Sequence, residues 1–296
     1  MCGIVGLHLR EPSLEPRLGQ LLSAMLGQVV ERGPDSAGVA VYGDPRLSPP
    51  GRAVVSLLGA TPAEAEAALA EAALPGAVAV QADATTVVHA GLSLADLLAA
   101  VAQALPRATV IGSGTGMAVL KGTGNPVRLA ESFGLASVTG WQGVGHTRMA
   151  TESAVTPEGA HPFSVGPGQC LVHNGSFANH ATIRRELRAR GVGFDSENDS
   201  EVGARFVAHQ LERGADLEKA LRLLCERFDG FYTLLVSTGD SFAVVRDAIA
   251  CKPALVAETS EWVAMASEYR ALDVLPGIEN ARIFEPEPEE VYVWRR

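Results

Sequence analysis

The 296-residue sequence is 47% hydrophobic and 20% charged, a composition typical of globular proteins that excludes a disordered chain. The length is enough for one large domain or two small ones with well-buried cores. A formal net charge of −10 and a pI near 5.2 argue against nucleic acid or an anionic membrane as the main partner.

Targeting and metal signals are absent from the sequence. The apolar N-terminal stretch is too short for a secretory signal and lacks a basic leader, and no run approaches the length of a membrane span. The four cysteines, Cys2, Cys170, Cys225 and Cys251, are scattered, with neither a CxxC pair nor a Cys/His ligand spacing. We therefore expect a cytoplasmic protein without a metal site.

Cys2 is one proteolytic step from being the first residue, because methionine aminopeptidase requires a small side chain after Met1. Removal of Met1 would leave one residue with both a thiol and a free α-amine, whose ordinary pKa is about 7.7–8.0. Such a pair is a built-in base and nucleophile. The alternative is a small buried cysteine without a chemical role, and the first six residues leave both interpretations open.

Residues 2–9 are predicted to form a strand, and apolar residues at helical spacing predict an amphipathic helix over 14–31. Arg32-Gly33-Pro34-Asp35 ends this helix, since glycine and proline are terminators. A strand at 39–42 follows, and the Pro/Gly-rich run at 44–51 is expected to be a linker.

Residues 52–121 differ in composition and are predicted to form an inserted subdomain. Their elements follow the order β-α-β-β-α-β, which is the ferredoxin-like module. They are expected at 54–58, 61–74, 77–81, 86–90, 94–105 and 109–112. The glycine-rich stretch 112–116 lacks the lysine of a phosphate loop and precedes a strand, so it is interpreted as a hinge.

The next strands are expected at 143–147 and 170–173, and the second runs into Asn174-Gly175. Asn-Gly is a strong hairpin signal. Here a helix at 181–190 follows instead of a second strand. An amide side chain and a backbone N–H at a strand end also suit an oxyanion hole, and local features leave both interpretations open.

Two helices and a series of strands complete the chain. The helices are expected at 196–213 and 217–228, and the strands at 231–237, 242–246, 254–256, 262–267, 282–284 and 291–294, the last two closing one sheet. Asp199 lies at the first helix start, where an acidic residue also serves capping and dipole interactions.

Seven motifs together make the sequence resemble the class II glutamine amidotransferases, which are N-terminal-nucleophile hydrolases. They occur in family order and cover most of the chain outside 44–140: Met-Cys-Gly-Ile-Val-Gly (1–6), Arg-Gly-Pro-Asp-Ser-Ala-Gly (32–38), Gly-His-Thr-Arg-Met-Ala-Thr (145–151), His-Pro-Phe (161–163), His-Asn-Gly (173–175), Glu-Asn-Asp-Ser-Glu (197–201) and Arg-Asp-Ala-Ile-Ala-Cys-Lys-Pro (246–253). The resemblance implies one domain over 1–296 with a four-layer αββα sandwich of two antiparallel sheets. The insert at 52–121 lies within it.

The resemblance also implies catalytic roles. Cys2 would attack the carboxamide of glutamine while its own α-amine shuttles the proton. The side-chain amide of Asn174 and the backbone N–H of Gly175 would hold the oxyanion.

Substrate binding follows from the same motifs. Arg148 would bind the substrate α-carboxylate with help from Thr151, and Asp199 would pair with the α-ammonium. Arg32 and Asp35 are expected to support the nucleophile loop. The motif at 246–253 is expected to be structural.

Among family members, the sequence resembles the amidotransferase-like subunit of N-methylglutamate synthase and related glutamate-synthase-like complexes. This implies a hetero-oligomer in which a partner synthase receives nitrogen, with no cofactor in this chain and a flavin or iron–sulfur cluster in a partner subunit. The alternatives are a catalytically silent subunit of such a complex and a free-standing amide hydrolase. Met149 stands where many relatives have an aromatic residue, and Glu152 where some have histidine.

Overall fold

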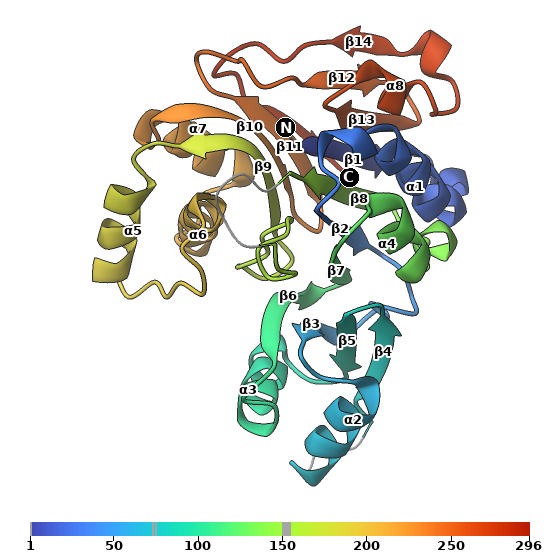
Figure 1. Ribbon diagram of the computed structural model, residues 1–296, viewed down its shortest axis with the longest axis vertical. Helices are drawn as coiled ribbons and strands as arrows, with labels where there is room; N and C mark the ends of the chain where they lie inside the picture. Colours follow the sequence, from blue (N-terminus) through green and yellow to red (C-terminus); the bar gives the residue numbers. More distant parts are fainter. Residues whose placement is uncertain (1, 73, 75, 150–154) are drawn as a thin grey trace.

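The computed structural model describes residues 2–72, 74, 76–149 and 155–296. Two antiparallel sheets stack face to face and helices cover both outer sides (Figure 1). Across the described residues, no helix combines the length and apolar character required to cross a membrane.

The larger sheet has seven strands in the order β14-β12-β13-β1-β8-β2-β7. Their bounds are β1 Gly3–Leu9, β2 Ser36–Tyr42, β7 Met117–Thr123, β8 Gln142–Arg148, β12 Leu255–Glu258, β13 Trp262–Ala266 and β14 Arg282–Phe284. β1 is central because it pairs with β8 on one side and with β13 on the other. The residue that precedes it, Cys2, therefore lies in the interior of the sheet rather than at an edge.

The smaller sheet has four strands in the order β15-β11-β10-β9. Their bounds are β9 Cys170–Phe177, β10 Gly230–Ser237, β11 Ser241–Arg246 and β15 Tyr292–Arg295. An apolar cluster with members from both sheets, including Ile4, Val144, Val172 and Leu235, fills the space between them.

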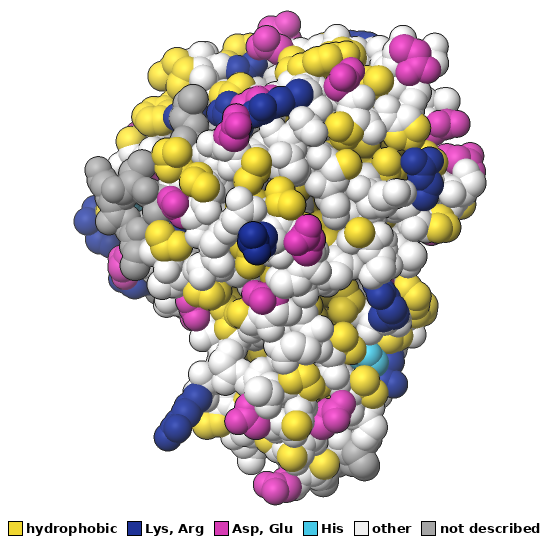
Figure 2. Space-filling model, turned by 45° about the vertical axis from the view of Figure 1, so that its right-hand side comes forward, with side chains coloured by type: hydrophobic (Ala, Val, Ile, Leu, Met, Phe, Trp, Pro, Cys, Tyr) yellow, Lys and Arg dark blue, Asp and Glu magenta, His cyan; other side chains and the backbone are white. Residues whose placement is uncertain are grey.

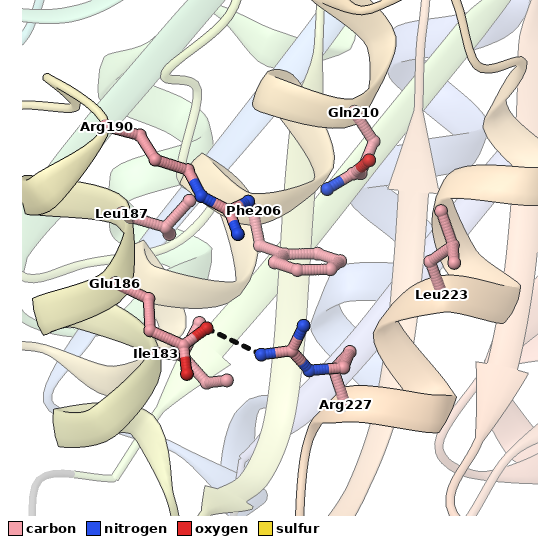
Figure 3. A pocket seen from close by; sticks show the side chains of 8 residues that line it. All are labelled: Ile183, Glu186, Leu187, Arg190, Phe206, Gln210, Leu223 and Arg227. Atoms are coloured by element: carbon pink, nitrogen blue, oxygen red, sulfur yellow. Dashed lines mark hydrogen bonds and ion pairs between the residues drawn. The ribbon is translucent and has the colours of Figure 1, made fainter.

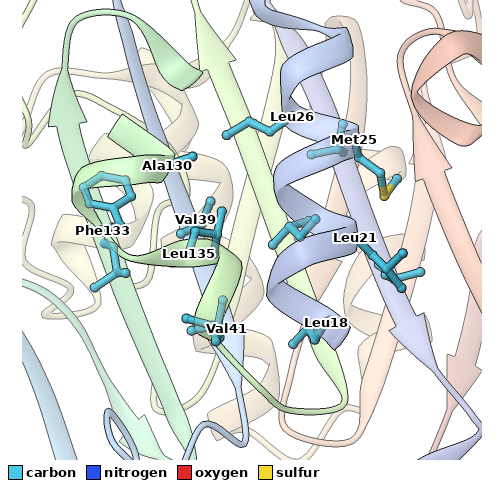
Figure 4. Close-up of a cluster of buried hydrophobic side chains, with 14 of the residues drawn as sticks. Leu18, Leu21, Met25, Leu26, Val39, Val41, Ala130, Phe133 and Leu135 are labelled. Carbon is cyan, nitrogen blue, oxygen red and sulfur yellow. The ribbon is translucent and has the colours of Figure 1, made fainter. Parts of the chain in front are cut away.

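One helical layer covers the large sheet. It contains α1 (Leu18–Gln28), α4 (Pro126–Ser132) and the short α8 (Tyr269–Leu272). Leucines and Met25 of α1 pack on valines of β1 and β2, and Figure 4 shows this cluster in close-up. The predicted helix over 14–31 is shorter because Pro16 lies in a preceding 3₁₀ turn and a second 3₁₀ turn, 30–32, follows.

The other helical layer covers the four-stranded sheet. It contains α5 (His180–Ala189), α6 (Asp199–Glu212) and α7 (Leu217–Arg227). Their apolar faces pack on alternate residues of β9, β10 and β11. The predicted four-layer αββα sandwich is therefore confirmed.

A third sheet, in the order β4-β5-β3-β6, forms the narrower lower part of the molecule in Figures 1 and 2. Its elements are β3 Ala53–Leu58, α2 Pro62–Glu71, β4 Val78–Ala82, β5 Thr85–Ala90, α3 Leu94–Ala104 and β6 Thr109–Thr115. The element order matches the predicted β-α-β-β-α-β module. Residues 117–121 of the predicted insert belong to β7 of the large sheet, so we propose 53–115 as the extent of the inserted subdomain.

Two sequence-based predictions about strands are wrong. Asn174-Gly175 does not lie at the end of a strand, because β9 continues to Phe177 and pairs with β10 along its whole length. β14 and β15 do not close one sheet: β14 pairs with β12 in the large sheet, and β15 pairs with β11 in the small one.

Candidate active site

The backbone carbonyl of Cys2 is contacted by residues from two separate segments. It accepts a hydrogen bond from Nε of Arg32 at 2.9 Å and one from Nδ2 of Asn174 at 3.3 Å. Cys2 itself is half-buried, and its thiol forms no disulfide. The next residue, Gly3, has no room for a side chain, because a Cβ there would lie 2.7 Å from Oγ1 of Thr147. These contacts fix the backbone that carries the thiol.

Arg32 and Asp35 precede β2 and join neighbouring segments. Nη1 of Arg32 forms an ion pair with Glu268 at 2.9 Å, so this side chain links Cys2 to the segment after β13. The backbone N–H of Asp35 donates to the carbonyl of Arg148 at 3.1 Å. These contacts are compatible with the predicted role of both residues in holding the nucleophile loop, which stays a prediction.

Asn174 and Gly175 lie inside β9, opposite Thr233 and Tyr232 of β10. Asn174 is 3% exposed and lies on the same face of β9 as Val172, a member of the cluster between the sheets, so its amide points toward Cys2. Gly175 has a φ of +150°, and a Cβ there would lie 2.0 Å from the carbonyl oxygen of Phe231. Only glycine fits this position.

Arg148 is the last residue of β8, one position beyond the Thr147 that pairs with Gly3. It is 6% exposed, and its Nη1 would lie 3.3 Å from a Cβ built at Gly159. The backbone of Arg148 therefore lies next to the Cys2 end of β1, and its guanidinium lies beside the segment around 159. Thr151, predicted to assist Arg148, lies outside the described residues.

Asp199 begins α6 and is held beside β9. Its Oδ2 accepts a hydrogen bond from the backbone N–H of Phe177 at 2.9 Å, and its Oδ1 lies 3.3 Å from Oγ of Ser200. Nδ1 of His173 lies 2.7 Å from the same Ser200 hydroxyl and 4.0 Å from Oδ1 of Asp199. His173, which precedes Asn174, therefore ties the proposed ammonium-binding carboxylate to the strand of the proposed oxyanion hole.

The His173 side chain is buried and stacks on Phe177 with ring centroids 4.3 Å apart. Burial lowers the pKa of His173 to about 4, against an opposing effect of Asp199. The imidazole is thus neutral near pH 7 and shares a hydrogen bond with the Ser200 hydroxyl.

A cluster of buried polar side chains lies next to the site. The ring centroids of His146 and His161 are 4.3 Å apart, and neither nitrogen of His161 has a hydrogen-bond partner among the described residues. Burial lowers the pKa of His146 to about 3 and that of His161 well below its usual value. Lys121 of β7 places Nζ 5.0 Å from the Phe163 ring centroid, and burial lowers its pKa to about 8.

The structure thus connects Cys2 directly to Arg32 and Asn174, and it places Gly175 next to Asn174. Arg148 ends β8, Asp35 precedes β2, and Asp199 begins α6 beside β9. Sequence reasoning missed Glu268, which has no motif and meets Arg32 only through the fold. It also gave no role to His173 or Ser200, although both lie in recognised motifs. Within the described ranges, no group of three or more His, Cys, Asp or Glu side chains is placed to hold a metal ion.

The loop that matches the motif at 246–253 is held by its own charged residues. Asp247 accepts hydrogen bonds from the backbone N–H groups of Tyr232 and Ile249, and Arg246 donates to the carbonyl of Ala250. The Lys252 carbonyl accepts from Thr233, the partner of Asn174 in β10. These contacts agree with a structural role for the motif.

Comparison with known proteins agrees with this fold and site. Residues 146–274 match the family described as the glutamine amidotransferase domain. The glutamine amidotransferase-like protein GlxB of Rhizobium meliloti is 50% identical over 99% of this chain and 98% of its own length. A glutamine–fructose-6-phosphate aminotransferase of Thermus thermophilus is 40% identical over 134 residues, 44% of this chain and 21% of that enzyme.

The glutamine phosphoribosylpyrophosphate amidotransferase of B. subtilis has a related fold, with a TM-score of 0.61 and 19% identity. The match covers 99% of this chain and 49% of that one, so the chain spans about half the length of this enzyme. The fold is thus that of the N-terminal-nucleophile amidotransferases. The chain belongs to the class II glutamine amidotransferase family.

Proposed function

We propose that this chain hydrolyses glutamine through Cys2 and supplies the released nitrogen to a partner synthase. The observation that carries the proposal is the 3.3 Å contact between Nδ2 of Asn174 and the carbonyl of Cys2. It brings the candidate nucleophile and the candidate oxyanion donor together across two different sheets, although they are 172 residues apart in sequence.

The proposal assigns a residue to each step. After removal of Met1, the α-amine of Cys2 takes the thiol proton while sulfur attacks the carboxamide carbon of glutamine. The amide of Asn174 and the N–H of Gly175 stabilise the oxyanion. The ammonium proton then passes to the leaving nitrogen as ammonia departs. Water hydrolyses the remaining thioester to glutamate and the free thiol.

Substrate orientation is assigned to two charged side chains. Arg148 binds the α-carboxylate, with Thr151 assisting, and Asp199 binds the α-ammonium. A guanidinium suits this task because its fork of donors matches a carboxylate. The Phe177 N–H and the Ser200 hydroxyl hold Asp199 in place before the substrate arrives.

For the partner, we propose a synthase of the N-methylglutamate synthase or glutamate-synthase type, in a cytoplasmic hetero-oligomer. The support is the resemblance of the motifs Arg-Met-Ala-Thr-Glu-Ser (148–153) and Ala-Cys-Lys-Pro (250–253) to the amidotransferase-like subunit of such complexes. Any flavin or iron–sulfur cluster would belong to the partner.

The test combines N-terminal sequencing of native protein with an assay of glutamate release from glutamine, with and without co-purified partners. We expect native protein to begin at Cys2 and to release glutamate from glutamine. Cys2→Ala should abolish this release. Cys251→Ala is the matched control, because Cys251 is exposed and outside the site.

Activity unchanged in Cys2→Ala would refute the assignment of the nucleophile. Retained Met1 with no glutamate release in the complete complex would replace the proposal with the silent structural subunit. Full activity of the isolated chain, with no stable partner on size exclusion, would favour a free-standing amide hydrolase.

A further inference from the structure

A pocket lies on the outer side of the molecule, between α5, α6 and α7 (Figure 3). Its volume is about 190 Å³. Ile183, Leu187 and Phe206 form an apolar floor, and all three side chains are nearly fully buried. The pocket can therefore hold the apolar part of a ligand.

The polar rim carries more positive than negative charge. Arg190, Arg227 and Gln210 point their polar ends toward the space beside the Phe206 ring (Figure 3). The Glu186 carboxylate pairs with Arg227 at 2.5 Å. Arg190 forms no ion pair with any described residue, so the pocket holds one uncompensated guanidinium.

The other arginines of the segment 180–190 are engaged outside the pocket: Arg184 and Arg188 pair with Glu197, and Arg185 bonds Thr182. The positive charge of this segment at the pocket is therefore that of Arg190. Arginine at a pocket rim favours carboxylate because its planar fork can donate two parallel hydrogen bonds. The side-chain amide of Gln210 supplies a further donor.

Size limits the ligand. A dry cavity of about 150 Å³ is enough to bind benzene. We propose that the pocket between α5, α6 and α7 binds a small carboxylate whose apolar body is about the size of one six-membered ring. The apolar body lies on Phe206, and the carboxylate meets Arg190.

This pocket is separate from the candidate active site. The two places share the helix α6, on which Phe206 lies two turns, about 10 Å, beyond Asp199. None of the residues assigned to glutamine binding lines it. The proposal therefore does not depend on the proposed function, and binding alone can test it.

The experiment titrates the full chain with benzoate and measures binding by calorimetry and by amide NMR shifts. We expect saturable binding with shifts at the pocket helices, and no binding of benzamide, which has the same ring but no charge. Arg190→Gln should lower the affinity for benzoate at least about tenfold, because a charge-assisted hydrogen bond is lost.

Two further variants sharpen the result. Arg185→Gln removes an arginine of the same helix that bonds Thr182 and does not line the pocket, so it should leave the affinity unchanged. Glu186→Gln frees Arg227 from its ion pair and should raise the affinity for benzoate. Equal binding of benzamide and benzoate, or unchanged affinity in Arg190→Gln, would overturn the proposal, as would the absence of saturable binding.

Discussion

Asn174 illustrates how one side chain can belong to the fold and to the site. Its backbone is a rung of the β9–β10 ladder, opposite Thr233, and its amide reaches across to the Cys2 carbonyl. Gly175 needs its positive φ to pass so close to Phe231. The rigidity of a paired strand would fix these two proposed donors before a substrate binds, which is what oxyanion stabilisation requires.

Replacement of Asn174 by alanine should lower kcat for glutamate release by about 10²–10³-fold, since one oxyanion donor is worth about 2.7–4 kcal/mol. Steady-state kinetics with glutamine would measure it. The control is Asn125→Ala, which removes the N-cap of α4 and should cost about 1 kcal/mol of stability without changing kcat. Equal kcat values for Asn174→Ala and the wild type would exclude Asn174 from the oxyanion hole.

At the scale of elements, α1 shows how tightly the outer helix layer packs. Gly19 lies under the turn at 135–138, and a Cβ there would be 1.9 Å from the carbonyl oxygen of Leu135. Gly27, near the other end of the same helix, has nothing within 4 Å of a built Cβ. Glycine is thus required for close approach at the first position only.

This difference predicts opposite effects of the same substitution. Gly27→Ala should raise the unfolding free energy by about 0.5–1 kcal/mol, because alanine loses less conformational entropy in a helix. Gly19→Ala should lower it, because the turn at 135–138 must move away. Urea denaturation of both variants would measure the pair, and stabilisation by Gly19→Ala would contradict the packing described for α1.

Strands and helices with a clear apolar period were predictable from the sequence, as β1, β10 and α7 show. Asn174-Gly175 was not, because its local turn signal is overridden by a ladder with residues more than fifty positions away. The motif residues of the site could be identified by resemblance. The Arg32–Glu268 pair and the buried Lys121 could not, since both depend on which strands become neighbours.

On the scale of the whole molecule, three neighbouring histidines are buried as neutral groups: His146, His161 and His173. Burial lowers all three pKa values below 6.5, to about 3 for His146 and about 4 for His173. The unfolded chain therefore binds protons below about pH 6.5 that the native protein does not bind.

Stability should fall as the pH drops from 7 to 5, with each histidine contributing at most about 1.4 kcal/mol per pH unit. This window lies above the usual carboxylate pKa values of about 4. Urea unfolding at several pH values would measure the slope, and His146→Asn should make it shallower. An identical slope in wild type and His146→Asn would contradict a native pKa of about 3 for this residue.

The central place of β1 has a consequence for biosynthesis. Val5 pairs with Ala266 and Gly3 with Thr147, so the first strand gains its second neighbour only after most of the chain has left the ribosome. Contacts of such long sequence separation form late in folding. One edge of β1 therefore stays unpaired until synthesis is nearly finished, and the strand next to the candidate nucleophile Cys2 has both of its neighbours only then.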